Sequence, residues 1–314
     1  MMCSTRLSML NAVRIGYFFV LSVLLLAGVA VRAEPIFGLT TTNSIVKFDS
    51  ATPGTVSAPI IIVTGIGAET LLDIDIRPED GALYALSSAG NLYLIDMTTG
   101  AAILSATLTG VVLDPAATRF GIDFSPTVDR LRIVSNTGQN LRLTPGSSVT
   151  TIDSALNGAA TGAVSVAYTN NDTDPATGTV LFYLGPSVPN TVFNSFNPNG
   201  GVLSIVGAMG VTSSQNVGFD ISGLTDIAFA SLQSPTGGGS SLYEINLGTG
   251  VASLIGSIDT GLALRGIAAS PAAGTVPEPG TLSAIGLGLL AMLLNGRRRR
   301  SVGCSAGSAT VPPV

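Results

Sequence analysis

The sequence contains no histidine and no tryptophan, and its only two cysteines, Cys3 and Cys304, lie near its ends. Without histidine, Ser-His-Asp and Cys-His nucleophilic catalysis, histidine-ligated zinc or copper, and a histidine general base are excluded. Without cysteine between its ends, the body has neither disulfides nor a cysteine-ligated metal. An aromatic content of 5% counts against the stacking platform of many sugar-binding sites. An enzyme built from this chain would use carboxylates, tyrosine, arginine or the single lysine, Lys47.

The central part of the chain is acidic. Seven of the 14 basic residues lie in the terminal segments, whereas all 19 acidic residues fall within residues 34–281, which therefore have 7 basic side chains and a net charge of −12. This balance argues against nucleic-acid binding, which depends on contacts of lysine and arginine with phosphate. It favours solubility outside the cell and attraction of divalent cations.

Residues 1–33 have the layout of a secretory signal peptide. Arg6 and Arg14 precede or open an apolar run over Ile15–Val31, and small residues stand at Val31 and Ala33. We expect signal peptidase to cleave after Ala33. An uncleaved membrane anchor is the alternative.

The opposite end carries a more specific pattern: a Pro-Glu-Pro motif, a short apolar stretch over Leu282–Leu294, and an arginine cluster. The residues of the motif and the cluster are Pro277, Glu278, Pro279, Arg297, Arg298, Arg299 and Arg300. The pattern resembles the PEP-CTERM sorting signal of exopolysaccharide-producing Gram-negative bacteria. That resemblance implies a membrane-held intermediate with the arginines on the cytoplasmic side, followed by cleavage by an exosortase-type protease. Members of this family usually end soon after the arginine cluster, whereas residues 301–314 follow it here. The sequence therefore does not decide whether the signal is cleaved.

An outline of apolar strand, turn, strand, turn and strand recurs along the central part of the chain. It is clearest over Arg119–Leu143, and Leu71–Met97 and Val217–Leu247 repeat it. Pro78 and Pro126, which close equivalent strands, are 48 residues apart. A period of about 40–50 residues with several short strands per unit is typical of a β-propeller. Tandem immunoglobulin-like sandwiches are the alternative.

Counting the repeats predicts an all-β chain that forms a β-propeller of about five blades. Four blades begin near Leu71, Arg119, Ala163 and Val217. The fifth is split: Leu262–Ser270 supplies its inner strand and Ile36–Val63 the outer three, so the ring closes by pairing N- and C-terminal strands. Because the unit after Ala163 is longer and less regular, the predicted number of blades is five, give or take one.

These patterns divide the chain into five parts. They are a signal peptide over 1–33, a propeller over 34–270, a linker with the Pro-Glu-Pro motif over 271–281, a short transmembrane segment with the arginine cluster over 282–300, and a disordered tail over 301–314.

Four of the seven basic residues of the central part fall in one repeat: Arg119, Arg130, Arg132 and Arg142. Arg130 and Arg132 alternate with apolar residues and share one face of a strand. Such arginines could clamp a carboxylate or a sulfate by bidentate hydrogen bonds. We favour the alternative, in which they pair with Asp123, Asp129 and Asp153 and hold neighbouring blades together.

The segments Asp129–Arg132, Gly138–Arg142 and Ala167–Asn170 together resemble the bacterial exported family catalogued as domain of unknown function 4394. The likeness covers most of Ile36–Ser270. It implies an exported propeller-like domain, often with a PEP-CTERM tail, and no assigned activity. Of the family's shared polar positions this chain has seven, which are candidates for ligand binding: Arg130, Arg132, Gln139, Asn140, Arg142, Tyr168 and Asn170.

Two groups of oxygen-bearing side chains complete the candidates. The first, Asn170, Asp172 and Asp174, suits a Ca²⁺ ion, although these residue types also form simple turns, which we favour. The second recurs on the strands expected to lie innermost: Asp73, Asp75, Asp123 and Asp220. Carboxylates there could serve a glycoside hydrolase as acid and base. Their recurrence with the repeat instead favours a structural role, in which each accepts hydrogen bonds from a neighbouring turn.

The sequence therefore favours an interaction or structural protein of the cell envelope or exopolysaccharide matrix. It predicts no catalytic residue and no cofactor besides the candidate calcium. The alternatives are a carboxylate-based glycoside hydrolase or lyase acting on matrix polysaccharide, and a calcium-stabilised adhesin. Expected partners are signal peptidase, an exosortase-type protease, and a polysaccharide or envelope protein. The expected route is export, an inner-membrane-anchored intermediate, and then the cell surface or extracellular matrix.

Overall fold

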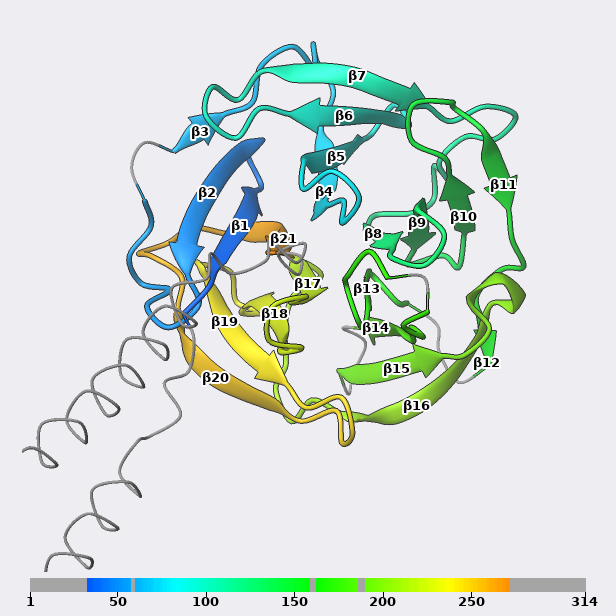
Figure 1. The fold of residues 1–314 in the computed structure, drawn as a ribbon. Coiled ribbons are helices and arrows are strands. Elements are labelled where there is room, and N and C mark those ends of the chain that lie inside the picture. The colour runs from blue at the N-terminus through cyan, green and yellow to red at the C-terminus, as the bar shows by residue number, and fades with distance from the viewer. Residues whose placement is uncertain (1–32, 58–59, 159–161, 175, 186–189, 271–314) are drawn as a thin grey trace, which may run out of the picture. The chain divides into compact units, whose positions relative to one another are not determined.

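The computed structural model describes residues 33–57, 60–158, 162–174, 176–185 and 190–270. This part of the chain forms five β-sheets arranged in a ring, each with one strand near the centre and one at the rim (Figure 1). Among these residues the only helical element is one short 3-10 helix, η1 (Pro198–Gly200). The fold is a five-bladed β-propeller, which confirms the predicted class and blade number and excludes the sandwich alternative.

Each blade runs from centre to rim in the same manner, and we number the blades by chain order of their inner strands. Blades 1 and 2 comprise β4 (Leu71–Ile76), β5 (Leu83–Ser87), β6 (Asn91–Ile95) and β7 (Ala102–Thr107), then β8 (Phe120–Ser125), β9 (Arg130–Ser135), β10 (Asn140–Leu143) and β11 (Thr150–Ile152). Blade 4 comprises β17 (Val217–Ile221), β18 (Ala228–Gln233), β19 (Ser240–Ile245) and β20 (Ala252–Ser257).

Blade 3 departs from the four-stranded plan of the other blades. Its main strands are β13 (Ser165–Tyr168), β14 (Leu181–Gly185), β15 (Thr191–Ser195) and β16 (Val202–Ala208). A fifth strand, β12 (Asn157–Gly158), pairs in parallel with β16. The extra strand comes from the connection leaving blade 2, so it joins these two blades at the rim.

Blade 5 closes the ring by pairing the two ends of the described chain, as predicted. Its order is β21 (Leu264–Ala269), β1 (Pro35–Thr40), β2 (Ser44–Asp49) and β3 (Ile61–Ile62). Ile36 lies opposite Ala269 in the antiparallel pairing of β1 with β21. The carboxylate of Glu34, which is 1% exposed, accepts hydrogen bonds from the hydroxyls of Ser222 and Thr225 in blade 4. The closing segment is therefore held by two blades.

The core lies between adjacent blades, because an inner strand is covered on both of its faces. Strands β4, β8 and β17 accordingly read as near-continuous apolar runs interrupted by aspartate, and almost all of their side chains are buried. Tyr84 of blade 1 and Phe124 of blade 2 meet edge to face, with ring centroids 5.2 Å apart. Aromatic and aliphatic residues of the repeat thus fill the wedges between the blades.

Glycine on the inner strands permits the close approach of these blades. A Cβ at Gly121 would lie 2.6 Å from the Cα of Ser165 in blade 3, and one at Gly266 would lie 2.0 Å from Oδ1 of Asp73 in blade 1. Both distances are far shorter than a van der Waals contact. A side chain at either position would force neighbouring inner strands apart.

The predicted signal peptide lies outside the described residues except for Ala33, which is exposed. The linker, the transmembrane segment, the tail and the sorting residues over 271–314 also lie outside them. Within the part of the chain that the structure describes, no helix has the length and apolar character needed to cross a bilayer.

Candidate functional site

The centre of the ring is lined by the axial aspartates, a name we use for Asp73, Asp75, Asp123 and Asp220. They lie on inner strands β4, β8 and β17, which surround the middle of the ring (Figure 1). All four are at most 2% exposed. Carboxylate oxygens of three of them, Asp75, Asp123 and Asp220, lie within 4.8 Å of one another, so this is the group of acidic side chains in the described residues that could hold a metal ion.

Asp75 and Asp220 use both carboxylate oxygens on backbone amides. In each residue Oδ1 accepts a hydrogen bond from the following N–H, of Ile76 and Ile221, at 2.7 Å. The other oxygen reaches the inner strand of the next blade: Asp75 Oδ2 accepts from the N–H of Phe124 at 2.7 Å, and Asp220 Oδ2 from that of Ala269 at 2.6 Å. Each carboxylate thereby joins two inner strands that have no backbone ladder between them.

Asp73 and Asp123 form the same kind of link. Asp73 Oδ2 accepts from the N–H of Ile122 at 2.9 Å, and Asp123 Oδ1 accepts from the N–H of Tyr168 at 3.2 Å. The recurring aspartate therefore accepts hydrogen bonds from backbone amides, as its repetition suggests. The expected partner, a neighbouring turn, is wrong: the donor is the inner strand of the next blade.

Burial changes the acidity of these carboxyl groups. Removal from water raises the pKa of Asp73 well above its ordinary value, and raises those of Asp75 and Asp123 with a further contribution from neighbouring carboxylates. Burial likewise raises the pKa of Asp220 to about 7. Three carboxyl groups this close cannot all be ionised in an apolar setting unless a cation joins them. Around neutral pH the cluster therefore holds protons or takes up a divalent cation.

Two of the arginine candidates, Arg132 and Arg142, belong to a network between blades 2 and 3. Arg132 is 2% exposed and donates to Asn140 Oδ1 at 2.8 Å, Asp153 Oδ2 at 2.5 Å and Asn199 Oδ1 at 2.6 Å. Its Nε donates to the Tyr168 hydroxyl at 3.3 Å. Each nitrogen of the guanidinium group thus donates a hydrogen bond to an acceptor of blade 2 or blade 3.

Arg142 completes this network by a bidentate contact with Asp153, at 2.7 and 2.8 Å. Although burial works against ionisation, Arg142 and Arg132 together lower the pKa of Asp153. Of the three acidic partners expected for the arginines, Asp153 alone is used. Asp129 instead pairs with Arg77 of blade 1, and Asp123 accepts the amide described above. Those two expected pairings are wrong.

The remaining ligand candidates do not join one site. Gln139 accepts from the N–H of Asp114 and donates to the carbonyl of Val112, which fastens the connection between blades 1 and 2. Arg130 has no hydrogen bond or ion pair through its side chain within the described residues. Asn170 donates to the carbonyl of Gly178 across its own loop.

In the candidate calcium loop, the aspartate side chains accept hydrogen bonds from the loop's own backbone. Asp172 Oδ1 accepts from the N–H of Asp174 at 2.8 Å, and Asp174 Oδ1 accepts from the N–H of Ala176 at 2.9 Å. Asn170 has a left-handed backbone, with φ of 54°. These features are typical of consecutive turns.

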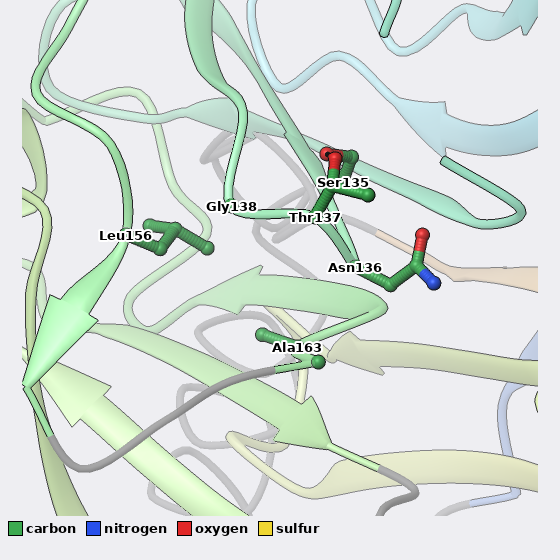
Figure 2. A pocket seen from close by; sticks show the side chains of 7 residues that line it. Ser135, Asn136, Thr137, Gly138, Leu156 and Ala163 are labelled. Atoms are coloured by element: carbon green, nitrogen blue, oxygen red, sulfur yellow. Dashed lines mark hydrogen bonds between the residues drawn. The ribbon is translucent and has the colours of Figure 1, made fainter. Parts of the chain in front are cut away.

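A small pocket lies beside the turn between β9 and β10 (Figure 2). Its volume is about 60 Å³, and its lining residues are Ser135, Asn136, Thr137, Gly138, Leu156, Gly162 and Ala163. Ser135 Oγ and Thr137 Oγ1 are hydrogen-bonded to each other at 2.8 Å. The space suits water rather than a sugar ring, since small-molecule sites usually exceed about 300 Å³.

Sequence reasoning missed Asn199 and Glu34, both of which hold blades together. Asn199 lies in η1, and the signal available for it was the run Asn197-Pro198-Asn199-Gly200-Gly201. Neither residue recurs with the repeat. Positions of this kind depend on contacts between distant segments, so periodicity does not reveal them.

The family model described as a domain of unknown function, DUF4394, matches residues 44–268, and the chain belongs to this family. The PEP-CTERM protein-sorting motif matches residues 275–300 and marks the chain as an exported protein processed by exosortase-type machinery. No curated protein matches the chain.

Solved structures resemble the fold only distantly. The chain is similar to one from a crystal structure of a nidogen/laminin complex, with 9% identity over 76% of this chain and 98% of the other and a TM-score of 0.45. It is also similar to AofleA from Arthrobotrys oligospora, with 12% identity over 73% of this chain and 72% of the other and a TM-score of 0.41. The propeller assignment rests on the chain's own sheet arrangement.

Proposed function

We propose that this protein is a surface-sorted interaction or structural protein of the cell envelope or exopolysaccharide matrix. One observation carries the proposal: the buried axial aspartates of this exported propeller accept hydrogen bonds from backbone amides of neighbouring blades. A glycoside hydrolase instead needs an acid and a base that face an open substrate cleft. The propeller thus supplies a rigid body, and the sorting signal directs it to the surface.

The glycoside hydrolase alternative finds no support in this arrangement. Asp75, Asp123 and Asp220 are close enough to act together, yet each is buried and hydrogen-bonded to backbone. The calcium-stabilised alternative keeps one specific point in its favour, since the same three carboxylates offer the oxygen ligands that Ca²⁺ accepts. We propose that their protons, rather than a resident ion, balance their charge.

The proposed location is tested in intact producing cells. We expect the native chain to be recovered with the extracellular matrix and to be degraded by protease added outside. A variant with Arg297–Arg300 replaced by glutamine should no longer be recovered with the matrix, because the arginine cluster holds the sorting intermediate in the membrane. Recovery of the native chain only with the inner membrane would contradict the proposal.

The proposed absence of catalysis is tested in the same preparation. Matrix polysaccharide incubated with the purified full chain should release no new reducing ends and no unsaturated sugars. Release that is lost in the Asp75→Asn and Asp220→Asn variants, while both variants remain folded, would establish the glycosidase or lyase alternative.

A further inference from the structure

One end of the ring axis carries two arginines that have no carboxylate partner. The inner strands of neighbouring blades run in the same direction, since Asp73 and Asp75 bind the amides of Ile122 and Phe124 in step. All five inner strands therefore begin at the same end of the axis. Arg119 directly precedes β8, and Arg265 is the second residue of β21.

Arg119 reaches from blade 2 to blade 4. Its Nη2 donates to Oδ1 of Asn216, the residue that precedes β17. Beside this contact, the hydroxyl group of Thr118 donates a hydrogen bond to Oε1 of Gln215 at 2.9 Å. Nε of Arg119 is buried and has no hydrogen-bond partner.

Arg265 reaches from blade 5 to blade 1. It lies at an irregularity in the pairing of β21 with β1, where Gly266 faces Leu39 and Leu264 faces Thr40, so Arg265 itself is left out of the register. Bulges of this kind re-aim a side chain. Its Nη1 and Nη2 donate at 2.7 Å to the carbonyls of Leu71 and Thr41, and its Nε is buried without a partner.

The two guanidinium groups lie close enough for the charge of Arg119 to act on Arg265. A Cβ at Gly218 would lie 2.6 Å from the carbonyl carbon of Gly266, so strands β17 and β21 touch there. Asn216, which holds Arg119, is two residues from that contact, and Arg265 is one residue from it. Burial lowers the pKa of Arg265, the positive charge of Arg119 lowers it further, and the carboxyl group of Asp73 raises it in part.

The charge of this pair is not balanced by an ion pair. Within the described residues, Arg77, Arg132 and Arg142 each contact a carboxylate, whereas Arg119 and Arg265 contact none. Two like charges close together, each with a buried N–H group that has no acceptor, lower the stability of the fold unless an acceptor binds them. A negatively charged acceptor satisfies both donors and relieves the repulsion.

We propose that Arg119 and Arg265 form an anion-binding site for a carboxylate group at this end of the propeller axis. A carboxylate offers two oxygens, one for each free Nε–H, and charge-assisted bonds of this type are the stronger ones. Both side chains are partly exposed, whereas their Nε atoms are buried, so binding requires each guanidinium to turn its Nε–H toward the carboxylate. The inference deepens the proposed function by naming the ligand chemistry, and it rests on that function only for the source of the carboxylate, an acidic matrix glycan.

Binding of galacturonate and of polygalacturonate to the purified full chain, measured by calorimetry, tests the site. We expect both to bind and the neutral methyl ester of galacturonate not to bind. Tighter binding per residue by the polymer would identify a matrix glycan as the source, and equal binding a free small carboxylate. Failure of both acidic probes at millimolar concentration would overturn the site without affecting the surface location tested above.

Matched variants locate the binding. Arg119→Gln should weaken galacturonate roughly tenfold or more, as expected for losing a charged hydrogen-bond donor. Arg130→Gln removes the same charge from the same blade away from this end and should leave binding unchanged. In the native chain, the ¹⁵Nε–H signals of Arg119 and Arg265 should shift on adding galacturonate. Unchanged affinity in folded Arg119→Gln, or unmoved signals, would contradict the assignment.

Discussion

Replacing Asp75 by alanine is expected to lower the free energy of unfolding by about 2–6 kcal/mol, since it leaves two buried amides without an acceptor at about 1–3 kcal/mol each. Those amides are the N–H groups of Ile76 and Phe124. Relief of repulsion with Asp123 and Asp220 offsets part of the loss. Urea unfolding followed by circular dichroism measures it.

Asp96→Ala is the matched control for that variant. Asp96 also accepts two backbone N–H groups, from Thr98 and Thr99, but it lies in an exposed turn. Water replaces the lost acceptor there, so the stability should change little. Equal effects of the two substitutions would show that Asp75 does not link the blades.

Replacing Arg132 by methionine is expected to cost about 3–5 kcal/mol of stability, the usual effect of removing one partner from a buried ion pair. The change leaves acceptors on Asn140, Asn199 and Tyr168 without a donor, although Arg142 still contacts Asp153. Thermal and urea unfolding of the variant measure the loss.

Arg142→Met supplies the comparison, because Arg142 contacts the same Asp153 from a more exposed position, with 21% of its side chain accessible. Its loss should cost less, about 1 kcal/mol. An Arg132→Met variant with unchanged stability would mean that the network between blades 2 and 3 does not stabilise the fold. It would also reopen Arg132 as a ligand-binding residue.

The fold could be predicted from the sequence because a propeller repeats one local pattern. Short apolar strands, the spacing of Pro78 and Pro126, and the split terminal unit are all local signals, and they indicate the blades and the closure. The axial aspartates were visible for the same reason, since they recur with the repeat.

The partners of these aspartates were not predictable in the same way. Whether Asp123 binds Arg132, its cross-strand neighbour, or the amide of Tyr168 depends on how closely two blades approach. That approach is set by glycines such as Gly121, whose role appears only when the next blade is in place. Arg265 is similar, because a break in strand pairing redirects a side chain that looks ordinary in sequence.

The most direct test of the structural role of the axial aspartates is the free energy of unfolding of the full chain between pH 4 and pH 8, in EDTA and in Ca²⁺. Folding raises the pKa of Asp220 from an ordinary value near 3.8 to about 7, so its stabilising contribution is complete at low pH and is lost as the pH rises through about 7. Asp153, whose pKa is lowered, loses its contribution only in stronger acid. We predict that stability falls from pH 4 to pH 8, equally with and without Ca²⁺, and that Asp220→Asn flattens the slope. Stability that rises with pH and collapses in EDTA would show that the cluster is a metal centre.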